Sequence, residues 1–422
     1  MKLGSARLPR LLLVLAGGAA ALAATPETAR RFALGPLVVV SIDGLRPDYV
    51  LDAERYGLRI PELRRLVAEG ASARGVTGVL PTVTYPSHAT LVTGVAPARH
   101  GILANHPFDP LGRNLDGWYW YAEDLRVRTL WDAAKEAGLR TASVDWPVTV
   151  GARIDWNLPQ VWRADTGDDA KLLRAVSTPG LLDEAERALG PWPYGSQASL
   201  DQDRRKATFN AWVLRTKRPR LHFAYFASLD EAQHADGPRS AGALRALEEL
   251  DRHVGELRRA ADSYGRATVA IVSDHGFAPA AFEFDLDGAL RKEGLVETDG
   301  HGRTTAWRAQ TWRAGASAAI VLKDPRDEDA RRRVATMLER LQAVRGGPVE
   351  RVLTGEDAAA QGGFPGAAFV VAFRPRPGEG PRSTPPGGSE HGGGEHGYLP
   401  ENRDMDATFL IAGPGVTAGA DL

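Results

Sequence analysis

Residues 37–43 read LVVVSID, and this stretch decides the fold class. Five of its first six residues are aliphatic, which is typical of a strand buried on both faces, and an aspartate follows at once. Runs of the same kind recur at residues 141–146, 221–227, 268–273, 318–322, 368–373 and 408–412. These runs predict a set of buried strands, several of which end in an acidic residue.

Helical patterns separate the apolar runs. Hydrophobic residues recur at helical spacing in residues 60–70, 129–138, 240–264 and 326–344. The alternation predicts an α/β fold with a central, mostly parallel β-sheet flanked by helices on both faces. Weaker strand signals in 152–218 predict a small cap or insertion over that core.

Charge and composition exclude some classes of function. The 422 residues include 52 Lys plus Arg and 53 Asp plus Glu, which gives a formal net charge of −1. The chain therefore has no global basic field to attract a nucleic-acid duplex, and local chemistry must hold any anionic substrate. Because the chain has no cysteine, a metal site would use His, Asp and Glu.

The first 24 residues have the pattern of a secretory signal peptide. Lys2, Arg7 and Arg10 precede a short apolar core, and the small residues at 21–23 match a cleavage site near Ala23 or Ala24. This pattern predicts a periplasmic or secreted protein, with a mature domain over 33–422 and no stable membrane span after cleavage. The alternative is an uncleaved anchor, although a spanning helix needs about 20 apolar residues and this run is shorter.

Acidic and histidine residues follow three of the predicted strands. In a parallel sheet the carboxyl ends of the strands lie at one edge, where ligands bind. Carboxylate oxygens and imidazole nitrogens suit a site for two metal ions. Taken singly, each of these residues could be a turn former, a helix cap or part of a solvated helix face. The candidates are Asp43, Asp230, His234, Asp274 and His275, with His396 added from the end of a Pro/Gly-rich loop over 374–397.

The stretch LPTVTYPSHATLVTG, residues 80–94, predicts a helix that begins near Pro86. Thr84 then lies at the helix entrance, where free N–H groups and the helix dipole favour a phosphate. A threonine becomes a competent nucleophile when a metal lowers the pKa of its hydroxyl. The alternative is that Thr84 only caps the helix. His88, one turn further on, is expected to support the site from behind its ligands or to be a packing residue.

Together these motifs resemble the alkaline phosphatase superfamily, and more closely its nucleotide pyrophosphatase/phosphodiesterase (type I phosphodiesterase) family. Five stretches carry the resemblance: VVVSIDGLRPDY, LPTVTYPSHATLVTGVAPARHGILAN, SLDEAQHADGP, IVSDHGF and HGYLPENRDMDATFLIAGPGV. The chain stops where family members usually continue with a further helical segment, which implies a truncated or different C-terminus.

The resemblance implies a role for each candidate. Thr84 would be the nucleophile, Asn105 would donate to a phosphoryl oxygen, and Tyr85 would stack on a nucleotide base. Two Zn²⁺ ions would be bound, one by Asp43, Asp274 and His275 next to Thr84, the other by Asp230, His234 and His396. His391 also precedes a glycine and is an alternative to His396.

The implied function is an exported phosphodiesterase or nucleotide pyrophosphatase that forms a phosphothreonine intermediate. Its substrate would be a small nucleotide-like diester. Alternatives on the same scaffold are a phosphomonoesterase, a phosphonate hydrolase and a lipid-headgroup phosphodiesterase. An alternative of another class is a non-catalytic protein that binds metal or phosphate. A sulfatase is disfavoured because the chain lacks the Cys/Ser-x-Pro-Ser/Ala-Arg pattern of those enzymes.

Overall fold

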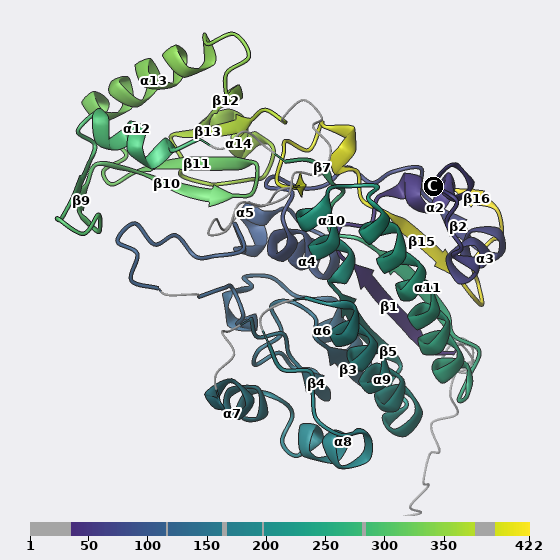
Figure 1. Ribbon diagram of the computed structural model, residues 1–422. Helices are drawn as coiled ribbons and strands as arrows, with labels where there is room; N and C mark the ends of the chain where they lie inside the picture. Colours follow the sequence, from purple (N-terminus) through teal and green to yellow (C-terminus); the bar gives the residue numbers. More distant parts are fainter. Residues whose placement is uncertain (1–34, 115–116, 163–166, 196–197, 281–283, 376–392) are drawn as a thin grey trace, which may run out of the picture. The chain divides into compact units, whose positions relative to one another are not determined.

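The main sheet of the computed structural model has eight strands (Figure 1). In spatial order they are β16 (Ala420–Asp421), β2 (Ala71–Ser72), β15 (Phe409–Ala412), β6 (Thr268–Val272), β1 (Leu37–Ile42), β5 (Leu221–Phe226), β3 (Thr141–Val144) and β4 (Trp156–Leu158). The structure describes residues 35–114, 117–162, 167–195, 198–280, 284–375 and 393–422. The predicted signal peptide and His391 lie outside these residues.

Strand β1 lies at the centre of the sheet. It pairs in parallel with β5, with Val38 opposite His222, and with β6, with Val38 opposite Val269. The pairs β3–β5 and β3–β4 are also parallel, while β15 runs antiparallel to β6. The prediction of a mostly parallel sheet is confirmed.

Helices cover both faces of this sheet, as predicted. Val38, Val40 and Ile42 of β1 pack in one cluster with Leu247 and Leu250. Figure 1 shows the helices of that face side by side: α9 (Leu200–Lys217), α10 (Ser228–Asp236) and α11 (Ala241–Asp262), with α3 (Pro61–Glu69) beside them.

The alternate residues of β1 face the opposite way. Leu37 and Val39 pack in a second cluster with Val92 and Trp131. These come from the two helices of that face, α4 (Thr84–Thr93) and α6 (Leu130–Glu136).

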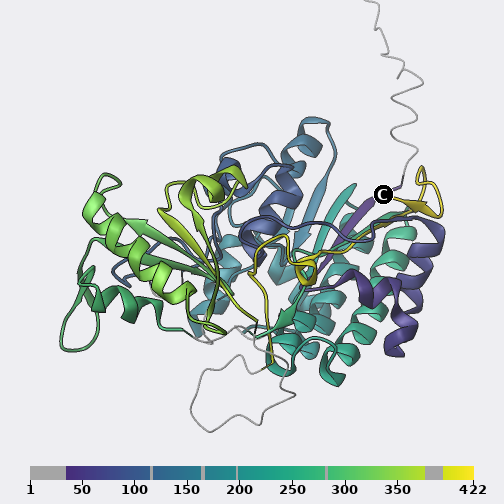
Figure 2. The same cartoon turned by 90° about the horizontal axis from the view of Figure 1, so that it is seen from above.

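A second, antiparallel sheet is formed later in the chain. Its order is β10 (Ala309–Ala314), β11 (Ser317–Leu322), β13 (Phe369–Phe373) and β12 (Val349–Thr354). Helices α12 (Leu286–Lys292) and α13 (Glu328–Gln342) pack on one face, as Figures 1 and 2 show, and α14 (Gly355–Ala360) packs on the other. The apolar runs at 318–322 and 368–373 are therefore strands of this sheet, not of the main one.

Residues 152–218, the predicted cap or insertion, are separate from this second sheet. It supplies the edge strand β4 and three helices, α7 (Gly167–Val176), α8 (Leu181–Leu189) and α9, which pack with β3 and β4. A run of apolar residues has the same pattern in either sheet, so the sequence did not separate the two.

Short elements complete the described part of the chain: α2 (Pro47–Leu51), η1 (Ala53–Tyr56), α5 (Pro97–His100), η2 (Ala122–Asp124), β7 (Ala278–Pro279), β8 (Val296–Thr298), β9 (Thr304–Trp307), β14 (Gly394–Glu395) and η3 (Arg403–Met405). Among the described residues, none of the helices has the length and apolar character that crossing a membrane requires.

Candidate metal centre

The register of the main sheet brings three carboxylates to one edge. Ile42 lies opposite Phe226, and Ser41 lies opposite Val272, so β1, β5 and β6 end at nearly the same level. Asp43 and Asp274 follow their strands within two residues, and Asp230 lies in the first turn of α10 after β5. This places the acidic candidates where ligands bind in an α/β sheet.

Asp43, Asp274 and His275 form the first group of candidate ligands. The Nε2 atom of His275 lies 3.4 Å from Oδ1 of Asp43 and 3.2 Å from Oδ2 of Asp274. All three side chains are buried. The structure therefore assembles the trio that the sequence assigned to one metal ion. Asp230 also lies close to this trio, with ligand atoms of Asp43, Asp230 and His275 within 4.8 Å of one another.

Asp230, His234 and His396 form the second group. Their ligand atoms also lie within 4.8 Å of one another. Asp230 and His234 share a face of α10 because they are four residues apart. His396 reaches them through the pairing of β14 with β7, and its ring stacks on that of His275 with 3.8 Å between ring centres. Asp230 thus belongs to both groups and joins them into one centre.

No lysine or arginine in the described part of the chain pairs with the carboxylates of this centre. Within the described residues, the ion pairs of Asp43, Asp230 and Asp274 involve histidines alone. Burial and the neighbouring carboxylates raise the pKa of Asp43. Burial also raises the pKa of Asp230, to about 8. Burial opposes ionisation of Asp274 as well, but His275, His88 and hydrogen bonds from Asp43 and the Gly44 N–H together outweigh it, and the pKa of Asp274 lies below its usual value.

Buried atoms without a hydrogen-bond partner gather in the same place. They are Oδ1 of Asp43, Oδ1 of Asp230, Oδ2 of Asp274 and Nε2 of His275. Burying such atoms without a partner costs free energy, so a cluster of them is typical of a ligand-binding site. Oxygen and imidazole nitrogen donors around one point fit a divalent cation such as Zn²⁺.

Thr84 is the first residue of α4, two residues earlier than the predicted start. The residue before it, Val83, occupies the N-cap position and has no capping side chain, so Thr84 is not the helix cap. Thr84 is 7% exposed and lines a cavity of about 450 Å³ together with Asp43 and Asp230. Thr84 thus shares a cavity with two of the carboxylates and lies at the positive end of the helix dipole.

His88 and Asn105 form hydrogen bonds with backbone groups at the start of α4, next to Thr84. The Nδ1 atom of His88 lies 2.8 Å from the Thr84 carbonyl oxygen, and its Nε2 lies 2.8 Å from Oγ of Ser41. His88 has no exposed surface, and its Nδ1 also lies 3.6 Å from Oδ2 of Asp274, so it contacts a candidate ligand. The Oδ1 atom of Asn105 accepts from the Tyr85 N–H at 2.9 Å, which leaves its NH₂ group as a donor at the cavity wall.

Tyr85 does not reach the cavity. Its side chain has no exposed surface, and its ring packs 5.2 Å from that of Trp118. Trp118 lines the cavity, as does Trp162, and these two rings are stacked with 6.2 Å between their centres. The structure therefore places Trp118, and not Tyr85, where a substrate could stack.

Sequence reasoning did not single out Trp118, Trp162 or Arg313 as wall residues. Arg313 lies on β10 of the second sheet and lines the same cavity. Nothing in the sequence distinguishes Trp118 and Trp162 from the other tryptophans of the chain. Arg313 reaches the cavity because β10 belongs to the second sheet. The sequence analysis did not distinguish that sheet from the main one, so it did not predict this contact.

A family model described as type I phosphodiesterase/nucleotide pyrophosphatase matches residues 37–398. The chain belongs to this family. Its resemblance to the alkaline phosphatase superfamily is thereby confirmed at the level of family and fold.

Relatives and solved structures agree with this assignment. Ectonucleotide pyrophosphatase/phosphodiesterase family member 3 of Mus musculus is 25% identical over 266 residues, which are 60% of this chain and 26% of the relative. The chain thus spans about a quarter of that protein's length.

Two solved structures share the fold. One is an inactive threonine-to-alanine variant of murine family member 5 in complex with AMP, with a TM-score of 0.59, 21% identity and coverage of 92% of this chain and 90% of that one. The other is phosphonoacetate hydrolase from Sinorhizobium meliloti 1021 in complex with phosphonoacetate, with a TM-score of 0.64, 21% identity and coverage of 91% and 92%.

Proposed function

We propose that this chain is an exported, metal-dependent phosphodiesterase or nucleotide pyrophosphatase that cleaves small nucleotide-like diesters through Thr84. The observation that carries the proposal is the convergence of Asp43, Asp230 and Asp274, each with a buried unpartnered oxygen, at one edge of the sheet. Asp43 and Asp230 line the same cavity as Thr84. Membership of the type I phosphodiesterase family supports it. Export rests on the sequence of residues 1–24.

The donor set supports two Zn²⁺ ions. Asp43, Asp274 and His275 would hold one ion, and Asp230, His234 and His396 would hold the other. When bound, such ions neutralise charge on attacking and leaving oxygens and lower the pKa of a bound hydroxyl or water.

The chain's own residues then perform two displacements. Oγ1 of Thr84 forms a bond to phosphorus while the bond to the leaving oxygen breaks, and water later cleaves the resulting ester to release the product and restore the hydroxyl. The NH₂ group of Asn105 and the N–H group of Thr84 donate to the phosphoryl oxygens, since the Tyr85 N–H is already bonded to Asn105 and Pro86 has none. Two inversions give net retention of configuration at phosphorus.

The cavity wall favours a leaving group with a flat apolar part. Trp118 and Trp162 offer aromatic faces on which a nucleobase can stack. We assign to Trp118 the stacking role that the resemblance implied for Tyr85. Arg313 adds a cation for a second phosphate of a pyrophosphate substrate. The AMP bound by the murine relative supports a nucleotide-like substrate.

A substrate panel tests this function. Zinc-loaded protein is assayed with p-nitrophenyl-TMP, p-nitrophenyl phosphate, phosphonoacetate and a phosphocholine diester under the same conditions. The nucleotide diester should be turned over fastest. Faster turnover of the monoester would make the chain a phosphomonoesterase. Faster cleavage of phosphonoacetate would favour the second candidate, a phosphonate hydrolase, which the similarity to the Sinorhizobium enzyme suggests. No turnover of any substrate would indicate a binding protein.

A further inference from the structure

Helix α10 carries Asp230 and His234 but has no local cap at its N-terminus. The N-cap residue, Ala227, has no side chain that can accept a hydrogen bond. The first N–H groups of a helix need acceptors from elsewhere when the end is buried. Here Oδ2 of Asp203, from α9, accepts from the Ser228 N–H at 2.8 Å. Asp203 has no exposed surface, so this bond is shielded from water.

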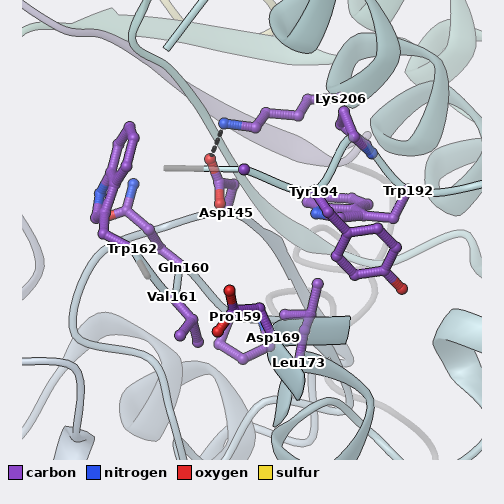
Figure 3. Close-up of a pocket in the computed structure, with 12 residues that line it drawn as sticks. Asp145, Pro159, Gln160, Val161, Trp162, Asp169, Leu173, Trp192, Tyr194 and Lys206 are labelled. Atoms are coloured by element: carbon purple, nitrogen blue, oxygen red, sulfur yellow. Dashed lines mark ion pairs between the residues drawn. The ribbon is translucent and has the colours of Figure 1, made fainter. Parts of the chain in front are cut away.

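A buried lysine acts electrostatically on this carboxylate, although burial still raises the pKa of Asp203. Nζ of Lys206, one turn along α9, lies 2.6 Å from Oδ2 of Asp145 at the end of β3 (Figure 3). Burial lowers the pKa of Lys206, but Asp145 and Asp203 outweigh it, and the net shift is upward. We call Asp145, Lys206 and Asp203 the α9 network. It links β3, α9 and the first turn of α10.

The same network touches the cavity wall. Nζ of Lys206 lies 5.6 Å from the centre of the Trp162 ring, and Trp162 lines the cavity beside Asp230. A shift of α9 would therefore reach both the helix that carries two candidate ligands and one of the aromatic walls.

We propose that Asp203 is a positioning residue that fixes the first turn of α10 and thereby sets Asp230 and His234 for metal binding. The inference rests on the proposed function only in that these two residues hold a metal. Asp230 lies two residues after Ser228, so a change in the Ser228 N–H bond acts directly on the turn that carries the Asp230 carboxylate. Groups that orient metal ligands without touching the metal typically change its affinity when removed.

The chain offers a matched control in Asp251 of α11. Its Oδ1 accepts from the Leu63 N–H at 2.7 Å, and its Oδ2 accepts from the Glu62 N–H at 3.1 Å. These N–H groups lie in the first turn of α3, whose N-cap residue Ile60 likewise makes no side-chain cap bond. Asp251 is 1% exposed. Helix α3 carries no candidate site residue, so Asp251 performs the same capping far from the metal ligands.

The test is a Zn²⁺ titration of metal-stripped protein against a chromogenic chelator, with thermal melting in parallel. Asp203→Ala should weaken zinc binding about 10–100-fold. Asp203→Asn keeps an acceptor oxygen but loses the charge at the helix end, and should weaken it about threefold. Asp251→Ala and Asp251→Asn should lower the melting temperature yet leave zinc affinity within about twofold of wild type, because distant sites act independently.

Equal zinc affinities in the Asp203 and Asp251 variants would overturn the inference and leave the proposed function standing. If Asp203→Ala does not fold, the comparison of Asp203→Asn with Asp251→Asn decides in the same way. A wild-type chain that binds no zinc would overturn the proposed function, and this inference with it.

Discussion

Two clusters of buried carboxylates lie close to α10, and they differ in one respect. In the α9 network, Lys206 supplies a cation between Asp145 and Asp203. In the candidate metal centre, the described ion pairs of Asp43, Asp230 and Asp274 involve only histidines. The first cluster thus contains a lysine of the chain, and among the described residues the second does not. Buried oxygens without a hydrogen-bond partner occur in both clusters, and burial raises the pKa of Asp145 and Asp203 as well.

The contrast separates a structural use of buried charge from a functional one. A buried charge is costly unless it is paired, and removal of one partner leaves the other uncompensated. The α9 network meets this requirement with its own lysine and stabilises the start of α10. In the metal centre, a bound cation would supply the positive charge that pairs with the carboxylates. The same carboxylates can therefore serve as a binding site for that cation. Mutations in the two clusters and in the cavity wall should therefore have different effects.

Thr84→Ala should lower turnover of a nucleotide diester by about 10³-fold or more, because the nucleophile is lost. Zinc content should stay at the wild-type level, since Thr84 adds little to the carboxylates and histidines. The matched control is Thr93→Ala in the same helix, whose hydroxyl donates to the Ala89 carbonyl at 2.7 Å. Steady-state rates and elemental analysis of both variants measure the effect. Wild-type turnover in Thr84→Ala would remove Thr84 from the reaction.

Lys206→Met and Asp43→Asn should change stability in opposite directions in the metal-free chain. Loss of Lys206 leaves Asp145 and Asp203 unbalanced and should cost about 3–5 kcal/mol of unfolding free energy. Asp43→Asn removes one of several like charges and should leave the metal-free chain at least as stable as wild type at pH 8. Urea unfolding of both variants in a chelator provides the comparison. A destabilised Asp43→Asn chain would show that this cluster is balanced without metal.

The pH dependence of stability should differ between metal-free and zinc-loaded protein. Burial raises the pKa of Asp43 and raises that of Asp230 to about 8 in the folded chain. A raised folded pKa gives stability that is full below the unfolded pKa, near about 4, and is lost as pH rises through the folded value. The metal-free chain should therefore melt at lower temperature as pH rises from 5 to 8.

Zinc should reverse this trend, since bound metal favours the ionised carboxylates and protons compete with it at low pH. Melting curves at several pH values, with zinc or with a chelator, measure the pH dependence of the zinc-loaded and of the metal-free protein. A metal-free chain whose melting temperature rises steadily toward pH 8 would contradict the charge deficit of the metal centre.

Trp118→Ala should raise KM for p-nitrophenyl-TMP by about tenfold, the scale of one lost base-stacking contact. A diester without a base, such as methyl p-nitrophenyl phosphate, should show little change. Tyr85→Ala serves as the comparison, because Tyr85 is buried behind Trp118 and should mainly lower the melting temperature. Equal losses for both substrates in Trp118→Ala would show that this ring does not contact the base.

The sequence predicted the main sheet well for a physical reason. The apolar runs of β1, β5 and β6 are continuous, and the polar residues directly after them mark the strand ends. The register of parallel strands then brings Asp43, Asp230 and Asp274 to one edge without further information. This local pattern was enough to select the three carboxylates, whereas His396 was chosen over His391 on the family resemblance.

Features that depend on distant packing were not predictable in this way. The bond from Asp203 to Ser228 joins residues 25 positions apart, and no local pattern reports it. Neighbouring positions in sequence also do not show which side chain reaches a cavity, so Tyr85 was chosen where the fold presents Trp118. The antiparallel sheet that carries Arg313 was missed because its buried strands have the same apolar character as those of the main sheet.

The metal content of the wild-type chain tests the central claim most directly. Elemental analysis of protein loaded with zinc and freed of excess metal should give about two ions per chain, as a two-metal phosphodiesterase requires. Asp230→Asn, which alters the residue shared by both ligand groups, should lower this value clearly. Less than about one ion per wild-type chain, or the same content in Asp230→Asn, would contradict a metal centre built on these carboxylates.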